Sequence, residues 1–331
     1  GIILAIRAVT LGAPVNPDWS SMKGLNYVWN PDLSQLTSSS VVTATGQIFF
    51  TLSLGMGIIC NYASYLQPDE DIVTASVATV ALNEFAEVIL AGTSVIPISY
   101  AFLGPEGIKG SIGLAFMALP NVFTTMAGGR IFGAVWFFLL FFAGFTSAIA
   151  MYNYLVALLE EELGVQRKKG ALLIFVLYLI VGAPIAAEGI ITGEANLIYF
   201  TEVDNWIGNY LLIVLGLLEV ITLAWLVKDE GLEEMNKGGL WHVPKWFYKL
   251  FHQFLTPICI IVFLGIFTRD YWIAGNFKIT PSYINGIEYM APWVNAARLV
   301  VVVVLIIGFI QTYRAIKRKY KDEIETNKAN A

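Results

Sequence analysis

Long apolar stretches separated by short polar connections make up most of the chain. A membrane-spanning helix needs about 20 predominantly apolar residues. Seven stretches reach that length, and they cover residues 41–66, 72–103, 130–163, 171–190, 205–227, 247–268 and 289–318. Residues 1–11 have the pattern of the end of one more helix, so we expect the sequence to be a fragment of a longer protein. The pattern predicts an all-α polytopic membrane protein.

Residues 104–129 depart from this pattern. They contain Gly and Pro and are only moderately apolar (GPEGIKGSIGLAFMALPNVFTTMAGG). A structureless loop of this length is uncommon. We therefore expect a re-entrant or extracellular helical hairpin here.

Composition agrees with a membrane protein and excludes several other classes. Hydrophobic types make up 57% of the chain and charged types 14%, whereas soluble domains carry about 45–50% and about 25%. No basic stripe is interleaved with aromatic residues, so nucleic acid is not an expected partner. The sequence has no HExxH, paired CxxC, GxSxG or GxxxxGK[ST] motif, and we expect no enzyme activity.

Lysine and arginine give the orientation in the bilayer. They gather in residues 164–170, in residues 228–249 and after residue 313, and they are scarce in residues 12–40, 104–129 and 190–204. Basic loops of membrane proteins face the cytoplasm. The C-terminus is therefore predicted to be cytoplasmic. The absence of any Asn-x-Ser/Thr sequon is compatible with the cytoplasmic membrane of a prokaryote.

The first apolar stretch is interrupted by polar residues and glycines. Its segment GQIFFTLSLGMG, residues 46–57, places Thr51 and Ser53 before Gly55 and Gly57. Each glycine lowers helix stability by about 1 kcal/mol. A break near the middle of the bilayer is tolerated where it lines a cavity or site. The alternative is an unbroken helix packed through its glycines, with Ser and Thr bonded to their own backbone.

Acidic residues inside the spans also need an explanation. Asn83 and Glu87 are four residues apart and share a helix face, whereas Glu84 lies off that face. A carboxylate at the bilayer centre costs about 2.5–3.5 kcal/mol on insertion scales. The pair predicts either a functional site or a buried structural hydrogen-bond network. Glu219 is another intramembrane acid, and the sequence shows no partner for it.

Adjacent hydroxyl groups occur in the span 130–163. Thr146 and Ser147 lie in FFAGFTSAIAM, and Ala143, Ser147 and Met151 stack at intervals of four residues. Hydroxyl and carbonyl oxygens are hard ligands suited to Na⁺. Ser and Thr also serve as packing contacts between membrane helices, and this segment alone does not separate the two interpretations.

Four segments in this order resemble the neurotransmitter:sodium symporter family, in particular its bacterial leucine-transporter-like branch. They are GQIFFTLSLGMG at 46–57, LNEFAEVILAG at 82–92, LPNVFTTMAGG at 119–129 and WFFLLFFAGFTSAIA at 136–150. The resemblance runs from the end of the family's helix five to helix twelve. It implies the second inverted repeat and the two extra helices of the leucine-transporter-type fold of the APC superfamily.

The resemblance assigns the parts of a single transporter domain, 1–331, that is truncated at its N-terminus. Residues 1–11 would be the end of helix five, residues 41–227 helices six to ten, and residues 246–318 helices eleven and twelve. Helix six would be the discontinuous helix at 41–66. In this family, substrate and Na⁺ bind near the midplane beside such breaks.

The resemblance also implies a set of site residues. Substrate contacts would be made by Phe50, Thr51, Ser53, Met56, Ser147 and Met151. One Na⁺ site would use Thr51 and Asn83, and a second would use Ala143, Thr146 and Ser147. Phe50 matches the aromatic lid, Asp204 the outer gate, and Tyr65, Ser64 and Glu161 the inner gate.

Several positions depart from the family pattern. Met56 and Met151 stand where the leucine transporter has Phe and Ile, which implies a pocket for larger or more varied apolar amino acids. Glu161 replaces the usual aspartate of the inner gate. Glu87 stands where chloride-dependent members have Ser, so its carboxylate would supply the negative charge. The implication is chloride-independent transport, with Glu87 as a candidate for proton counter-movement.

The expected function is Na⁺-coupled symport of a neutral, apolar amino acid by alternating access. Two Na⁺ sites are expected, each incomplete in this chain, and the chain alone is expected to be inactive. The expected partners are a small amino acid and the lipid bilayer, and the resemblance allows a homodimer of the full-length protein. The alternatives are a degenerate, non-transporting membrane protein and a membrane-embedded enzyme, although no nucleophile–base pair or metal cluster is visible.

Overall fold

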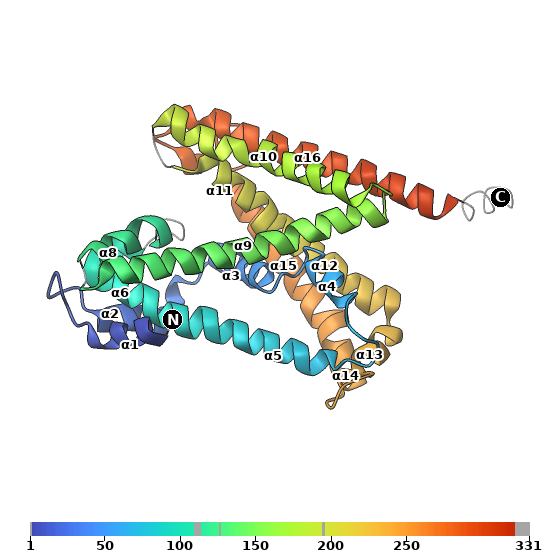
Figure 1. Cartoon of the computed structure of the whole chain (residues 1–331), viewed down its shortest axis with the longest axis horizontal. Coiled ribbons are helices and arrows are strands. Elements are labelled where there is room, and N and C mark those ends of the chain that lie inside the picture. Colours follow the sequence, from blue (N-terminus) through green and yellow to red (C-terminus); the bar gives the residue numbers. More distant parts are fainter. Residues whose placement is uncertain (1, 109–113, 126, 194–195, 322–331) are drawn as a thin grey trace. The chain divides into compact units, whose positions relative to one another are not determined.

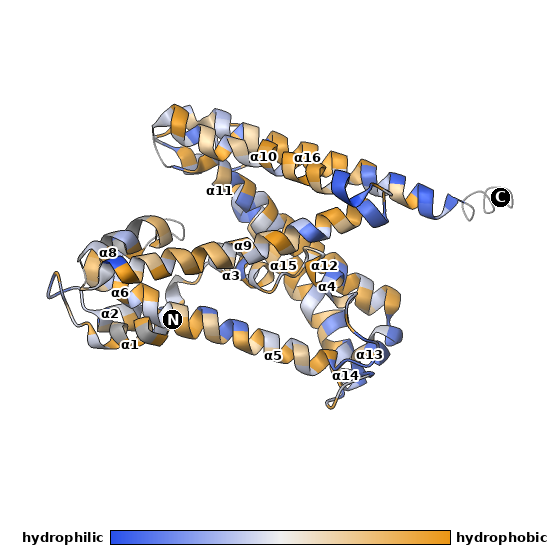
Figure 2. Cartoon of the chain, viewed as in Figure 1, coloured by the Kyte–Doolittle hydropathy of each residue, from blue (hydrophilic) through white to orange (hydrophobic). Residues whose placement is uncertain are grey.

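The computed structural model describes residues 2–108, 114–125, 127–193 and 196–321, and all regular structure within these residues is helical (Figure 1). Six helices there are long and apolar enough to cross a membrane. They are Ile72–Leu103, Gly129–Glu161, Arg167–Thr192, Ile198–Val227, Lys245–Ile273 and Glu288–Lys319. These confirm six of the predicted spans and an integral, multi-pass membrane protein. Figure 2 shows apolar residues along their length and polar residues at the C-terminal end of α16.

Three of the six spans contain one or more wider, π-helical segments. The first consists of α5 (Ile72–Glu84), a π-helical segment (Phe85–Gly92) and α6 (Thr93–Leu103). The second joins α11 (Ile198–Asp204) and α12 (Leu212–Ile221) through Asn205–Leu211 and continues into Thr222–Val227. The third joins α14 (Lys245–Tyr248) and α15 (Thr256–Ile273) through Lys249–Leu255. The other long helices are α9 (Gly129–Glu161), α10 (Arg167–Thr192) and α16 (Ala291–Lys319).

The remaining predicted span is broken at its glycine-rich segment. Helix α3 (Ser38–Thr51) ends before the segment, and α4 (Ile58–Ala63) begins after it. Ser53, Gly55 and Gly57 all adopt positive φ angles, of 56°, 71° and 71°. A left-handed backbone interrupts the α-helical hydrogen bonds. The discontinuous helix is therefore confirmed, and the alternative of an unbroken, glycine-packed helix is wrong.

The chain divides into two compact units. The first comprises Gly1–Leu36, Asp69–Ser147 and Met235–His242. In it, α1 (Ile2–Thr10) and α2 (Ser21–Trp29) pack on α6. A methyl group on Gly24 would lie 2.6 Å from the Cα atom of Pro97, so glycine permits this close approach. The core of this unit is formed by Ala8, Ile98, Phe102 and Val122.

Residues 104–129 belong to this first unit. Their described parts are a 3₁₀ turn (Pro105–Ile108), a π-helical segment (Leu114–Ala118) and α8 (Leu119–Thr125). Residues 109–113 and 126 of the predicted helical hairpin lie outside the described residues. The hairpin stays a prediction.

The second unit comprises Thr37–Pro68, Ala148–Glu234 and Val243–Ala331. Helix α3 packs there on α12 and α15. Their shared core contains Val42, Ile213, Ile260 and Leu264. A second cluster joins α11 to the segment before α16 and to α16 itself, and it contains Ile198, Ile284, Met290 and Val294. These contacts fix α3, on one side of the break, against the helices that follow.

Candidate functional site

The break between α3 and α4 is held by a carboxylate from α12. Glu219 Oε2 accepts a hydrogen bond from the backbone N–H of Gly55 at 3.0 Å. A Cβ atom on Gly55 would lie 2.7 Å from the carbonyl oxygen of Leu212, so the chain passes too close to α12 for a side chain. Gly57 packs in the same way against the ring of Tyr154. At both positions glycine therefore permits a left-handed backbone and a close approach of the neighbouring helix, which a side chain would block.

This contact supplies the partner that the sequence could not show for Glu219. The carboxylate is 164 residues away from Gly55 in the chain, and its partner is a backbone amide that no motif records. A buried N–H group left unpaired by a helix break needs an acceptor. Glu219 meets that need, and its hydrogen bond is charge-assisted.

The break brings four of the substrate-set residues onto one short segment. Phe50 and Thr51 end α3, while Ser53 and Met56 lie in the connection to α4. Phe50 is 49% exposed, so about half of its surface is accessible beside the break. The C-terminal end of a helix carries a partial negative charge. The end of α3 can therefore attract a cation or an ammonium group.

Asn83 and Glu87 lie where α5 passes into its π-helical segment. Asn83 Nδ2 donates to Glu87 Oε2 at 3.5 Å, which confirms that the two share a face. π-Helical turns are frequent at functional sites. Thr51, the other residue assigned to this Na⁺ site, belongs to the second unit, whereas Asn83 and Glu87 belong to the first.

The three residues of the second predicted Na⁺ site lie within one turn of α9. The hydroxyl of Thr146 donates to the carbonyl oxygen of Ala143 at 3.2 Å and to that of Phe142 at 2.9 Å. Because the hydroxyl donates its proton to the backbone, its lone pairs remain available to a cation. Ser147 follows directly on the same helix, and all three residues are exposed within this chain. Neutral oxygens in this arrangement fit a hard cation.

The predicted gate residues differ in their surroundings. At the end of α11, Asn209 Nδ2 lies 3.5 Å from Asp204 Oδ2, and among the described residues no cation pairs with this carboxylate. Glu160 pairs with Arg167 at 3.0 Å and Glu162 with Lys319 at 3.3 Å. Glu161 stands between these two bound acids and forms no ion pair within the described part of the chain.

Ser64 and Tyr65 follow α4. The hydroxyl of Ser64 donates to the carbonyl oxygen of Asn61 at 2.7 Å, and Tyr65 is 67% exposed. Met151 lies on α9 in the second unit, one turn beyond Ser147 in the first. The structure describes every predicted site residue, and within one unit it brings together Asn83 with Glu87 and Ala143 with Thr146.

Comparisons with known proteins point to one family. The sequence model of the sodium:neurotransmitter symporter family matches residues 2–318. An uncharacterized sodium-dependent transporter of Methanocaldococcus jannaschii is 32% identical over 293 residues, which are 84% of this chain and 56% of the relative. The sodium-dependent transporter YhdH of Bacillus subtilis is 30% identical over 273 residues, which are 80% of this chain and 58% of the relative.

A solved structure is similar in fold. The crystal structure of MhsT in complex with L-phenylalanine has a TM-score of 0.68 and 30% sequence identity, and the match covers 80% of this chain and 59% of that chain. The chain therefore spans somewhat more than half the length of the relatives it matches. These proteins are transporters, which contradicts the alternative of a membrane-embedded enzyme. The predicted leucine-transporter-type fold is confirmed.

Proposed function

Because the chain belongs to the sodium:neurotransmitter symporter family, we propose that it forms the larger part of a Na⁺-coupled symporter for a neutral, apolar amino acid. The observation that carries this proposal is the helix break, in which Glu219 fixes the amide of Gly55. A broken helix in a membrane is stable where it lines a site. Transport would proceed by alternating access, without covalent chemistry.

The substrate would bind beside the break. Its ammonium group would meet the carbonyl end of α3, where the helix dipole is negative. Phe50, Thr51, Ser53 and Met56 would contact the substrate from this segment, and Ser147 and Met151 from α9. Methionine side chains adapt to different apolar shapes, which favours a broad range of apolar amino acids. The relative MhsT was crystallised with L-phenylalanine.

Two Na⁺ ions would be the co-substrates. Thr51 and Asn83 would bind one, and the carbonyl of Ala143 with the hydroxyls of Thr146 and Ser147 would bind the other. Each Na⁺ that moves inward gains about 2.3 kcal/mol per 100 mV of membrane potential. Because the remaining ligands belong to the part of the family fold that the chain does not span, residues 1–331 alone would bind neither Na⁺ nor substrate tightly.

The gates and the charge balance complete the proposal. Asp204 would close the outer gate against an arginine of the part of the family fold outside this chain, and Phe50 would form the aromatic lid above the substrate. Ser64, Tyr65 and Glu161 would belong to the inner gate. Glu87 would replace chloride and could carry a proton outward. No chloride requirement is therefore proposed.

The arrangement in the membrane is also part of the proposal. The chain would form one transporter domain, with residues 1–11 as the end of helix five, residues 41–227 as helices six to ten and residues 246–318 as helices eleven and twelve. The C-terminus would be cytoplasmic, because α16 ends in Lys317, Arg318 and Lys319. The full-length protein could form a homodimer.

Equilibrium binding tests the proposal. The full-length protein, purified in detergent, would be incubated with radiolabelled neutral amino acids in NaCl, in KCl and in sodium gluconate. We expect saturable binding in both sodium salts and none in KCl. Thr146→Val removes one proposed Na⁺ ligand at nearly constant volume and should shift the Na⁺ dependence to higher concentration. Binding that is equal in NaCl and KCl would contradict the proposal and favour a degenerate, non-transporting protein.

A further inference from the structure

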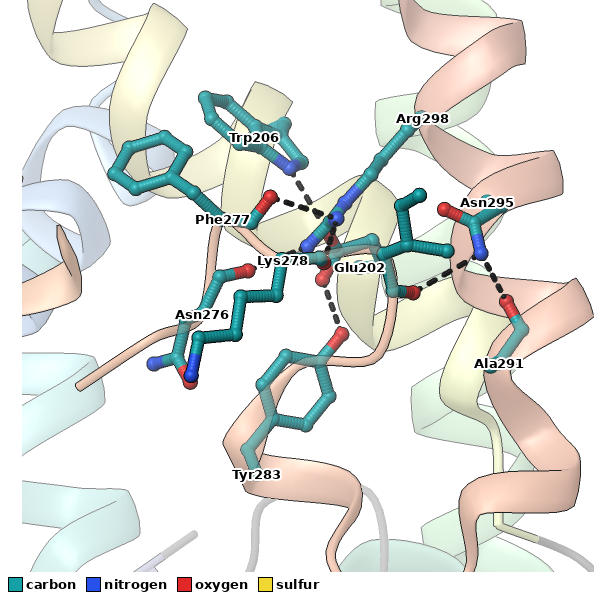
Figure 3. A network of polar contacts seen from close by, with 10 residues as sticks. Glu202, Trp206, Asn276, Phe277, Lys278, Tyr283, Ala291, Asn295 and Arg298 are labelled. Carbon is teal, nitrogen blue, oxygen red and sulfur yellow. Dashed lines mark hydrogen bonds and ion pairs between the residues drawn. The ribbon is translucent and has the colours of Figure 1, made fainter.

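A fully buried carboxylate on α11 accepts hydrogen bonds from three side chains (Figure 3). Glu202 has 0% side-chain exposure. Its Oε1 accepts from Arg298 Nε at 2.6 Å and from Trp206 Nε1 at 2.9 Å. Its Oε2 accepts from the hydroxyl of Tyr283. A buried carboxylate is stable only with such partners, and here they come from three segments of the second unit.

The guanidinium of Arg298 binds on its other side to the segment that joins α15 to α16. It donates to the carbonyl oxygens of Lys278 and Asn276, each at 2.6 Å. One turn earlier on α16, Asn295 Nδ2 donates to the carbonyl oxygen of Ile279 at 3.0 Å. Arg298 therefore joins α11, α16 and the connection between α15 and α16 at one point.

Tyr283 adds to this junction as a neutral donor. Burial, together with its hydrogen bond to Glu202, raises the pKa of the Tyr283 phenol. The hydroxyl therefore keeps its proton at any pH at which the protein is used. It supplies the hydrogen bond to Glu202 without adding a charge.

The network lies on the same helical turn as Asp204, the acid of the proposed outer gate, but on the opposite side of the helix. Glu202 precedes Asp204 by two residues, and Trp206 follows it by two. The hydrogen bond from Trp206 to Glu202 therefore links the residues on either side of Asp204 and spans the helical turn that carries it. Because two residues turn a helix by about 200°, Asp204 projects from the opposite side of the helix to Glu202. Asp204 is exposed, whereas Glu202 is buried.

A second contact holds the beginning of the same helix. Glu188 on α10 is buried, and its two oxygens accept the backbone N–H groups of Ile198 and Tyr199 at 2.7 Å. Helix α11 is thus anchored at its first turn by α10 and near its last turn by α16. Beyond Asp204 the helix widens into the π-helical segment Asn205–Leu211.

We propose that Glu202, Arg298 and Tyr283 are positioning residues that hold the Asp204 turn as the fixed side of the outer gate. The gate would then close by the approach of a cation to Asp204, while α11 stays in place. This inference rests on the proposed function, because Asp204 has a gate to serve only in a transporter. If the contacts of Glu202 with Arg298 and Tyr283 were lost, the Asp204 turn would move and bound substrate would dissociate before the gate closes.

The test is a double-mutant cycle in the full-length protein in proteoliposomes. Glu202→Gln keeps the shape of the side chain but leaves Arg298 without a counter-charge, and Tyr283→Phe removes one donor only. We expect Glu202→Gln to raise KM for Na⁺-driven uptake about tenfold and Tyr283→Phe about threefold, with maximal rates changed less than about twofold. In an Asp204→Asn background neither change should alter KM, because the coupling through Asp204 is gone.

Controls separate positioning from folding. Lys245→Met breaks the exposed pair of Lys245 with Asp229 and should leave KM unchanged. Tyr283→Phe retains a ring of the same shape and serves if Glu202→Gln fails to fold, as judged by thermal melting. The proposal would be overturned if Glu202→Gln or Tyr283→Phe raised KM in the Asp204→Asn background as much as in the wild type. It would also be overturned if either single variant had the wild-type KM.

Hydrogen exchange of residues 198–206 distinguishes this proposal from the proposed function. We expect amide exchange in this segment to increase about tenfold in Glu202→Gln, because the hold on the turn is weakened. Unchanged exchange would overturn the inference whether or not the protein transports. If the wild-type protein shows no Na⁺-dependent uptake, the gate role fails with the proposed function. The exchange result then decides only whether the ion pair holds the turn.

Discussion

A methyl group on Gly55 would lie 2.7 Å from the carbonyl oxygen of Leu212 and 3.1 Å from the amide nitrogen of Gly216. Both neighbours are backbone atoms of one helical span, so neither can turn away as a flexible side chain could. The φ angle of Gly55 is 71°, and a left-handed backbone costs a non-glycine residue about 1–2 kcal/mol. Gly55→Ala must therefore shift the break itself.

The shift would also weaken the hydrogen bond from Gly55 to Glu219. Hydrogen bonds to charged groups contribute about 1.5–3 kcal/mol. With the backbone strain, the substitution should cost about 2.5–5 kcal/mol in the conformation that forms the substrate site. Since about 1.4 kcal/mol corresponds to a tenfold change in affinity, Gly55→Ala should weaken Na⁺-dependent substrate binding by at least about sixtyfold.

Gly308→Ala is the matched control. Gly308 lies within α16, and nothing lies within 4 Å of the position that its Cβ would take. Alanine in a helix interior stabilises by about 0.5–1 kcal/mol relative to glycine, so binding should be unchanged. The assay is equilibrium binding to the purified full-length protein. Wild-type affinity in Gly55→Ala would refute the role of Gly55 and Glu219 in shaping the break.

Three further predictions concern pH, chloride and the isolated chain. Backbone and side-chain hydrogen bonds from Thr74, with a smaller contribution from the amide of Leu240, hold the pKa of Asp71 below its usual value. The stabilisation by Asp71 should therefore be complete above its unfolded pKa of about 3.9 and be lost as the pH falls through the lower folded value. Melting curves of Asp71→Asn and wild type should differ at pH 7 and converge in acid. Glu87→Ser in the full-length protein should create a chloride requirement for uptake, and uptake that ignores chloride would remove the proposed role of Glu87. Residues 1–331 alone should show no saturable Na⁺-dependent binding in calorimetry, and a tight signal would contradict the incomplete ion sites.

The sequence predicted the spans because hydrophobic length is a local property. Ser53, Gly55 and Gly57 fall together within one apolar stretch, but this pattern left an unbroken helix open, and only the resemblance to the family favoured the break. The sequence missed α2 in the connection 12–40, because this helix has only nine residues and their polar mixture hides the pattern. The face shared by Asn83 with Glu87 followed from helical spacing alone. The grouping of Ala143 with Thr146 came from the resemblance to the family.

Long-range pairings were beyond the sequence. The span that carries Asp204 begins at Ile198, seven residues before the predicted residue 205. The predicted span left out Glu202, which is buried and paired with Arg298, 96 residues further along the chain. Glu219 and Gly55 are a second such pair. A carboxylate can be assigned to a buried site only when its partner is known.

Na⁺-driven accumulation tests the central claim most directly. The full-length protein would be reconstituted into liposomes loaded with potassium buffer, and uptake of a radiolabelled apolar amino acid would be followed after dilution into sodium buffer. We expect accumulation above the external concentration, and we expect this accumulation to collapse when the Na⁺ gradient is dissipated. Uptake that only equilibrates, at the same rate with and without the gradient, would contradict Na⁺-coupled symport by this protein.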